Sequence, residues 1–373
     1  MKRMRVLILS SDTGEGHNSA AKATKEALEN RGCECSIVDT MSFRGSRQKR
    51  LVSNSYNKLV RKAPAAFGAV YKAGDLYSST GIPSPVYFAN TLYAKTLADY
   101  VRENGYDAVV CTHLFAMEAL TYLKKKNQID FPCFSVLTDY TCIPFLKETR
   151  LDEYFVPSEA VRKECIEKGM DEKKLFATGI PVSGRFKRRM SRDEARDYLA
   201  IPKDIPVFLI MTGGVGSGNA AAICDRLLET EKTDFLAYVF VGRNNDLKEA
   251  LEKRYQEKPQ IKVVAFTEDI NIYMNAADVL ISKAGGITST EAAVAGVPLV
   301  HTMMIPGCET KNAELFEACG MSFKADDPKT AVSLADELVN NKETAERMRE
   351  AQHRIINENA ADDIAERVMS YGK

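Results

Sequence analysis

The stretch RVLILSSDTGEGHNSAAKATKEALENRG, residues 5–32, joins a short apolar run to a helical pattern through a turn that contains Gly14 and Gly16. The apolar run predicts a buried strand, and the helical pattern closes on Gly32, a residue type that commonly ends helices. A strand that leads directly into a helix is typical of a parallel α/β sheet. The turn also places His17, one of four histidines in the chain, where the helix must begin.

The same alternation of short Val- and Ile-rich runs with helical patterns continues along the chain and restarts after a charged, proline-punctuated stretch. Strands that are apolar on both faces indicate parallel sheets covered by helices on both sides. We therefore expect two Rossmann-like α/β domains facing a central cleft, residues 1–183 and 184–373, joined near 184–204. The last helix, from about Lys342, can return to the first domain. The predicted strands lie at residues 5–10, 35–39, 106–113, 133–139, 153–158, 175–182, 206–214, 236–242, 262–267, 277–282 and 297–303.

Composition narrows the class of protein. Hydrophobic residues make up 45% and charged residues 27% of the 373 residues, as in soluble globular proteins, and the formal net charge is zero. This balance gives no global attraction to nucleic acid. Nine cysteines without any C-x-x-C pair indicate a reducing compartment and no structural zinc site. The apolar run near the N-terminus is too short for a signal peptide or a membrane span, so we expect a cytoplasmic or peripheral protein.

Glycine-bearing loops follow predicted strands at residues 13–18, 212–219 and 282–292. Glycine lets a ligand approach the main chain, and a helix that starts next favours an anion, so the three loops together favour a diphosphate. Ordinary strand-to-helix turns are the alternative for any one of them. The Walker pattern is absent, which argues against an ATPase, and the sequence contains no D-x-D pair that could bind a divalent metal. We expect no metal cofactor.

His17 is the unusual element of the first loop. A helix N-terminus disfavours the imidazolium ion, so a neutral ring there is suited to act as a general base toward a hydroxyl group. A histidine that only caps the helix is the alternative. A nicotinamide-dependent oxidoreductase using Gly14, Gly16 and Asp39 also stays open, although Ser19 replaces the third glycine of that fingerprint. A non-catalytic nucleotide-sugar-binding protein is the third possibility.

The stretch SSDTGEGHNSAAKATKEAL, residues 10–28, resembles the opening of the monogalactosyl- and diglucosyl-diacylglycerol synthases. Further motifs of that family follow at the right intervals: VCTH ending at His113, TDYTC at 138–142, GIPV at 179–182, SKAGGITSTEAAVAGVPLV at 282–300 and IPGCETKNAELF at 305–316. The resemblance covers nearly the whole chain and extends to MurG-type transferases. It implies the two-domain GT-B architecture and an inverting transfer of a hexose from a UDP-sugar to the hydroxyl of diacylglycerol or a glycosyl-diacylglycerol. Glucose, galactose and N-acetylglucosamine all stay open.

The resemblance also implies roles for single residues. His17 would deprotonate the acceptor hydroxyl. Two motifs depart from the family: Ile143 stands where a histidine is common, and Cys308 where glutamine is usual, which leaves the acceptor contact and the donor sugar open. The implied acceptor-side residues are Gly16, His113 and Asp139, and the implied donor-side residues are Gly213, Gly214 and Gly216 beside the diphosphate, Gly285, Gly286, Ile287 and Thr288 at the phosphates, Glu291 on the ribose, and Glu309 and Asn312 toward the sugar or phosphates.

No acidic residue occurs between Asp39 and Asp75, whereas basic residues and aromatic residues alternate there. Each basic residue near an anionic bilayer contributes on the order of 1 kcal/mol, so this segment, residues 40–74, is predicted to hold the protein on the inner face of the cell membrane. A solvated basic surface is the alternative. The residues expected to face the membrane are Arg47, Lys49, Arg50, Lys58, Arg61 and Lys62.

Overall fold

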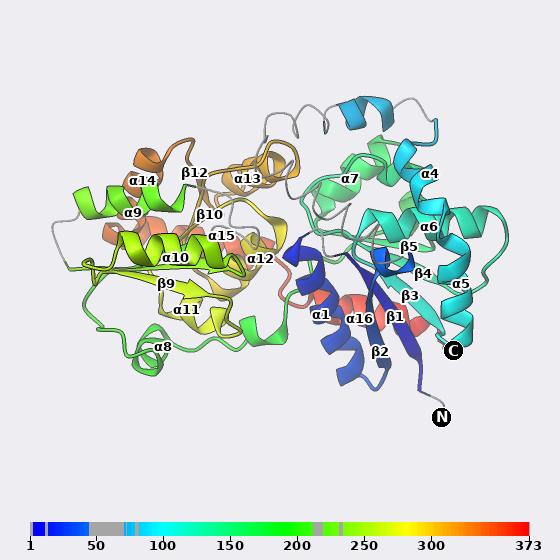
Figure 1. Ribbon diagram of the computed structural model, residues 1–373, viewed down its shortest axis with the longest axis horizontal. Helices are drawn as coiled ribbons and strands as arrows, with labels where there is room; N and C mark the ends of the chain where they lie inside the picture. The colour runs from blue at the N-terminus through cyan, green and yellow to red at the C-terminus, as the bar shows by residue number, and fades with distance from the viewer. Residues whose placement is uncertain are drawn as a thin grey trace. The chain divides into compact units, whose positions relative to one another are not determined.

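The structure is a computed structural model that describes residues 3–11, 14–44, 71, 73–78, 82–211, 219–230 and 234–372. It contains two parallel sheets of six strands each, flanked by helices (Figure 1). The predicted α/β class with two Rossmann-like sheets is confirmed. Residues 1–184, 306–308 and 357–373 form one compact unit, and residues 185–305 and 309–356 form the other.

The first sheet has the strand order β2-β1-β3-β4-β5-β6. The chain leaves β1, β3 and β4 at the same edge, because neighbouring strands are parallel. This edge carries the first candidate site. The strands are β1 (Arg5–Ser10), β2 (Glu34–Asp39), β3 (Ala108–Cys111), β4 (Cys133–Val136), β5 (Glu153–Val156) and β6 (Leu175–Ala177). Among the described residues, the helices of this unit include α1 (Glu15–Asn30), α4 (Pro85–Thr91), α5 (Ala94–Glu103), α6 (Leu114–Lys125), α7 (Glu159–Glu167) and α16 (Ala360–Ser370), with short 3₁₀ turns η1 (Thr40–Arg44), η2 (Leu146–Glu148) and η3 (Glu172–Lys174). A further 3₁₀ turn, η4 (Gly184–Phe186), lies where the chain passes from the first unit to the second.

Helix α16 is the last helix of the chain, yet it packs beside α1 against the first sheet (Figure 1). Ile364 and Val368 are fully buried in the same apolar core as Ile8 of β1. Burying each of these side chains contributes about 1.5–3 kcal/mol. The core of the first unit is therefore closed by a segment from the opposite end of the sequence.

A charged cluster also ties α16 to the sheet. The Arg367 guanidinium donates to the Glu153 carboxylate of β5 over 2.9 Å, and the Tyr371 hydroxyl donates to the same carboxylate over 3.1 Å. Glu153 is buried, so these donors compensate a charge that would otherwise be costly to hold away from water.

The second sheet has the order β12-β11-β10-β7-β8-β9, with β10 between β7 and β11. All its strand pairs are parallel. Its strands are β7 (Val207–Met211), β8 (Leu236–Gly242), β9 (Ile261–Ala265), β10 (Val279–Ser282), β11 (Leu299–His301) and β12 (Phe323–Lys324), and its helices are α8 (Arg192–Tyr198), α9 (Ala220–Thr230), α10 (Asn245–Arg254), α11 (Ile270–Ala276), α12 (Gly286–Ala295), α13 (Cys308–Ala318), α14 (Pro328–Asn340) and α15 (Lys342–Ile355).

The charged stretch that we expected to join the domains is itself folded. It contains α8, whose N-terminus has a capping box formed by Ser191 and Glu194. Arg196 of this helix is completely buried and pairs with Asp278 over 2.7 Å. Its remaining donors bind the carbonyl oxygens of Ala276, Pro202, Lys203 and Ile205 over 2.8–3.1 Å. The stretch is thus part of the second unit, with an arginine at its centre.

Candidate active site

His17 lies in the first turn of α1, immediately after the edge where β1 ends. Gly14 is the N-cap of this helix, with a φ of −173°, an extended conformation that any residue can adopt. A Cβ on Gly14 would lie 3.9 Å from Cδ2 of His17, an ordinary contact. Backbone conformation therefore does not require glycine at position 14, and the histidine ring lies close to the main chain there.

Two neighbouring strands supply the groups that hold the His17 ring. Its Nδ1 lies 2.8 Å from the carbonyl oxygen of Thr112, which follows β3, and 3.1 Å from the hydroxyl oxygen of Thr138, which follows β4. Thr112 and Thr138 are both buried. Because β1, β3 and β4 are neighbours in the sheet, their carboxyl ends bring residues far apart in sequence onto one ring.

His113 packs edge-on against His17, with 4.6 Å between the ring centroids and an interplanar angle of 84°. It is also the N-cap of α6, where its Nδ1 accepts the backbone N–H of Phe115 over 3.2 Å. Burial, together with the neighbouring His17, holds the pKa of His113 well below 6.5. His113 is therefore neutral at physiological pH.

The pKa of His17 is also lowered from 6.5, and burial is the main cause. The negative charge of Asp139 and the hydrogen bond to Thr112 oppose this change. His17 is thus neutral near pH 7, as a general base must be, and burial is the main cause. Of the predicted acceptor-side residues, the structure brings His113 and Asp139 to His17, and Gly16 precedes His17 in the same helical turn.

On the second unit, α12 begins at Gly286 directly after β10, and Gly285 is its N-cap. Glycine has no side chain that could cap this helix, so the N–H groups of its first turn, which contains Ile287 and Thr288, have no side-chain acceptor from the N-cap. Gly285 has φ −72° and ψ 132°, again conformations open to other residues. The uncapped helix N-terminus is a suitable place for an anion.

Glu291 lies on α12, one turn further along. Burial raises the pKa of its carboxyl to about 7, and the nearby Arg185 opposes this change. No hydrogen bond to its carboxylate occurs within the part of the chain that the structure describes. Glu291 therefore carries acceptor atoms that a pair of hydroxyl groups could use.

Lys283, between β10 and the N-cap of α12, is a residue that the sequence analysis did not single out. Its ammonium group lies 3.5 Å from where a Cβ on Gly285 would be, and it forms an ion pair with Glu309 of α13. The second oxygen of Glu309 accepts the N–H of Ile305 over 2.9 Å. The signal was present in the sequence, since this lysine lies in the glycine-bearing loop at residues 282–292.

Asn312 is completely buried on α13, and its Nδ2 donates to the Ala284 carbonyl oxygen over 2.9 Å. This hydrogen bond stabilises the loop that leads into α12. Among the predicted donor-side residues, the structure therefore gathers Gly285, Gly286, Glu309 and Asn312 around that loop. Gly213, Gly214 and Gly216 lie outside the described residues, as do Arg47, Lys49, Arg50, Lys58, Arg61 and Lys62.

Within the described ranges, no group of histidine, cysteine or carboxylate side chains has the arrangement needed to hold a metal ion. No helix in the same ranges combines the length and the apolar character needed to cross a bilayer.

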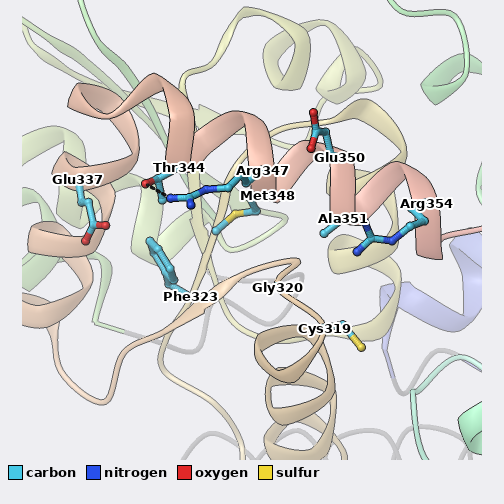
Figure 2. A pocket seen from close by; sticks show the side chains of 10 residues that line it. All are labelled: Cys319, Gly320, Phe323, Glu337, Thr344, Arg347, Met348, Glu350, Ala351 and Arg354. Carbon is cyan, nitrogen blue, oxygen red and sulfur yellow. Dashed lines mark hydrogen bonds between the residues drawn. The ribbon is translucent and has the colours of Figure 1, made fainter.

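A separate hollow of about 590 Å³ opens on the second unit beside α14, β12 and α15 (Figure 2). Side chains of both charges line it, among them Glu337, Arg347 and Glu350, and Arg347 donates to the Thr344 hydroxyl over 3.4 Å. None of the residues around the α12 loop lines this hollow. Its mixed charge gives no selectivity for an anion.

The two halves of the chain match different family models. Residues 17–182 match the family model of monogalactosyldiacylglycerol (MGDG) synthase, and residues 208–368 match the glycosyltransferase family 28 C-terminal domain. The chain is 26% identical over 373 residues to the processive diacylglycerol beta-glucosyltransferase of Bacillus cereus strain AH187, which covers 99% of this chain and 94% of the relative.

Solved structures share the fold. MurG of Acinetobacter baumannii superposes with a TM-score of 0.63 at 18% identity, covering 99% of this chain and 100% of MurG. HepE of Anabaena, in complex with UDP, gives a TM-score of 0.61 at 14% identity, covering 98% and 100%. The two Rossmann-like units of this chain therefore have the GT-B architecture. The chain is a glycosyltransferase whose first half matches the monogalactosyldiacylglycerol synthases and which is similar over its whole length to processive diacylglycerol glucosyltransferases.

The matches to glycosyltransferases leave the oxidoreductase alternative without support. In that alternative the carboxylate of Asp39 would bind a ribose. In the structure it accepts the backbone N–H of Met41 over 2.9 Å at the start of η1. It thus has a local role in the turn after β2.

Proposed function

We propose that this glycosyltransferase moves a hexose from a UDP-sugar to the hydroxyl of diacylglycerol or a glycosyl-diacylglycerol, with inversion, at the inner face of the cell membrane. The observation that carries the proposal is the neutral His17, held through Nδ1 at the sheet edge of the unit that matches the MGDG synthase model. The name of the Bacillus relative supports diacylglycerol as the acceptor, and the UDP bound to HepE supports the donor class.

In the proposed reaction, His17 takes the proton of the acceptor hydroxyl while its oxygen attacks the anomeric carbon. The bond from that carbon to the diphosphate oxygen breaks on the opposite face, and UDP leaves with the bonding electrons. An α-linked donor then gives a β-glycoside. A general base of this kind is typically worth 10²–10⁴-fold in rate.

The second unit would bind the donor. The N–H groups at the start of α12 and the ammonium of Lys283 are positive groups at one loop, suited to the charge that develops on the departing diphosphate. Glu291 would accept hydrogen bonds from the two ribose hydroxyls. Fixed donors of this type can stabilise a leaving diphosphate without a divalent cation, so the proposed mechanism uses none.

The first unit would meet the membrane. On the first unit, Phe88 of α4 and Leu92, the C-cap of that helix, are 58% and 84% exposed. Exposed apolar side chains of this size are suited to enter a bilayer interface once charge attraction has brought the protein there. They support membrane-surface action from within the described residues.

The test is a transfer assay with diacylglycerol in phosphatidylglycerol vesicles, comparing UDP-glucose, UDP-galactose and UDP-N-acetylglucosamine, each with and without excess EDTA. We expect a β-linked glycolipid, identified by NMR, from one of these donors in the presence of chelator. His17→Ala should lose at least 100-fold in turnover, while its calorimetric affinity for UDP stays within about twofold. A variant with more than about a tenth of wild-type turnover, or an α-linked product, would contradict the mechanism.

A further inference from the structure

The surroundings of His17 determine which ring nitrogen carries the hydrogen. The oxygen 2.8 Å from Nδ1 is the carbonyl oxygen of Thr112, which can only accept a hydrogen bond. Nδ1 must therefore be the N–H donor of the neutral ring. Nε2 then has the free lone pair, and no hydrogen bond to Nε2 occurs in the described ranges of the chain.

Both acceptors around Nδ1 are fixed to the sheet. The N–H of Thr112 donates to the Leu9 carbonyl oxygen of β1 over 3.0 Å, so this main chain is tied to the strand that precedes His17. Leu137, the residue before Thr138, donates to the Phe155 carbonyl oxygen of β5 over 2.9 Å. The position of the Thr138 hydroxyl is thus set by strand pairing and not by a free loop.

The adjacent histidine has the opposite arrangement. Nδ1 of His113 accepts the Phe115 N–H, so the hydrogen of this neutral ring is on Nε2. Two histidines in edge-to-face contact therefore differ in tautomer, because one ring meets a backbone acceptor and the other a backbone donor. This contrast gives a spectroscopic signature that does not depend on any reaction.

From this geometry we propose that Thr138 is a positioning residue, which together with the Thr112 carbonyl holds His17 as the Nδ1–H tautomer with Nε2 directed to the acceptor hydroxyl. The role of Nε2 rests on the proposed function, whereas the tautomer rests on the hydrogen bonds alone. As Nε2 takes a proton, the ring becomes a cation and its Nδ1–H becomes a stronger donor. The Thr138 oxygen therefore stabilises the protonated ring more than the neutral ring.

The other charged or titratable groups that act on His17 are Asp139 and His113. Asp139 follows Thr138 in the chain and favours the protonated ring, and neutral His113 supplies no charge. A substitution at position 138 must therefore leave Asp139 in place. Valine has nearly the shape of threonine and lacks the oxygen, and serine keeps the oxygen and lacks the methyl group.

The experiment compares Thr138→Val and Thr138→Ser with wild type, with Thr141→Val as the matched control. Thr141 is buried in the same loop, but its hydroxyl bonds Glu164 over 3.1 Å and does not touch His17. Histidine ¹⁵N NMR on the full chain reports the tautomer and the pKa of His17, assigned by its loss in His17→Gln. The pH profile of kcat/KM and the KM for the donor are measured in parallel.

We expect wild-type His17 to be the Nδ1–H tautomer and His113 the Nε2–H tautomer. Thr138→Val should lower the pKa of His17 by roughly half a unit to one unit, move the acid limb of kcat/KM to lower pH, and reduce kcat about tenfold with an unchanged donor KM. Thr138→Ser should restore all three quantities, and Thr141→Val should leave the His17 pKa unchanged.

An Nε2–H tautomer at His17 would overturn the inference. So would a Thr138→Val variant with the wild-type pKa of His17, or a Thr138→Ser variant that behaves like the valine. If the NMR results agree with expectation but wild type transfers no hexose from any donor, the proposed function fails while the positioning of His17 by Thr138 stands.

Discussion

Glu291 titrates near neutrality, since burial raises its pKa to about 7. A carboxylate holds a vicinal diol more strongly than a carboxylic acid does, because both hydrogen bonds are charge-assisted. UDP affinity should therefore increase as the pH rises from 6 to 8. Glu291→Ala should weaken UDP binding by about 1.5–3 kcal/mol, and Glu291→Gln should remove most of the pH dependence.

Calorimetric titration with UDP at pH 6, 7 and 8 measures both effects. Glu314→Ala, an exposed substitution on α13, is the matched control and should bind UDP like wild type. Unaltered UDP affinity in Glu291→Ala would remove this residue from the donor site.

Glu118 of α6 is a buried acid outside the candidate site. No N–H or O–H group in the described ranges donates to its carboxyl oxygens, and its neighbour is the carboxyl of Glu148, so a hydrogen bond between the two requires a shared proton. Burial, and then the charge of Glu148, raise the pKa of Glu118 to about 10, although Lys125 opposes this change. The folded state therefore holds a proton that the unfolded chain releases near pH 4.5.

A group with a raised folded-state pKa gives its full stability below the unfolded value and loses it as the pH rises toward the folded value. Stability should thus decline between about pH 5 and pH 10. Glu118→Gln mimics the protonated acid and should raise the free energy of unfolding by about 1–3 kcal/mol at pH 8, and less at pH 5.

Urea unfolding at both pH values measures this difference. Glu103→Gln, an exposed change of the same charge on α5, should have no such effect. A Glu118→Gln protein less stable than wild type at pH 8 would show that the carboxyl is ionised in the folded state.

The residues of the site were predictable to different degrees. His17 stands out in the sequence because a histidine follows two glycines at a helix start. Thr138 and the Thr112 carbonyl give no such signal, since their contacts with His17 come from the strand order β1-β3-β4, in which β3 lies between β1 and β4. Lys283 was visible beside its glycines, but only the structure pairs it with Glu309.

At the scale of elements, the apolar runs predict eleven of the twelve strands that the structure describes. The twelfth, β12, has only two residues, and no apolar run in the sequence predicts it. Helix α8 was missed because its surroundings are charged, and the burial of Arg196 depends on carbonyl oxygens that its sequence neighbourhood does not reveal. The spacing of hydrophobic residues identifies helices and strands that have an apolar face. It does not identify an element such as α8, which is held in place by the hydrogen bonds of a buried arginine.

Helix α16 should affect the stability of the first unit only. Ile364→Ala leaves a cavity in the core shared with β1 and should cost about 2–4 kcal/mol. Calorimetry should show a lower melting temperature for the first unit, and UDP binding by the second unit should be retained. Glu366→Ala, on the exposed face of the same helix, is the control. Loss of UDP affinity in Ile364→Ala would place this helix with the second unit.

At the scale of the whole molecule, zero net charge leaves membrane attraction to local surfaces. We expect the protein to sediment with phosphatidylglycerol vesicles at low salt and less so at high salt, because the Debye length falls to about 8–10 Å near physiological ionic strength. Replacing Lys58, Arg61 and Lys62 by glutamate should remove the charge attraction. Phe88→Glu combined with Leu92→Glu should reduce the binding that remains at high salt.

Tyr198→Glu is the matched control, since Tyr198 is 64% exposed on α8 of the second unit. It should sediment like wild type. Equal binding of the wild type to neutral and anionic vesicles would contradict a charge-driven membrane surface.

The return of α16 to the first sheet also sets the order in which the protein can mature on the ribosome. Strand β1 is synthesised before the second unit, but the helix that covers its core side emerges only after the whole second unit. At roughly 5–20 residues per second, translation from Gly184 to Asn357 takes on the order of ten to thirty seconds. During that interval the nascent first unit exposes the apolar surface that Ile364 and Val368 later cover. The second unit can fold first, and the unit that carries His17 is completed only after α16 has emerged.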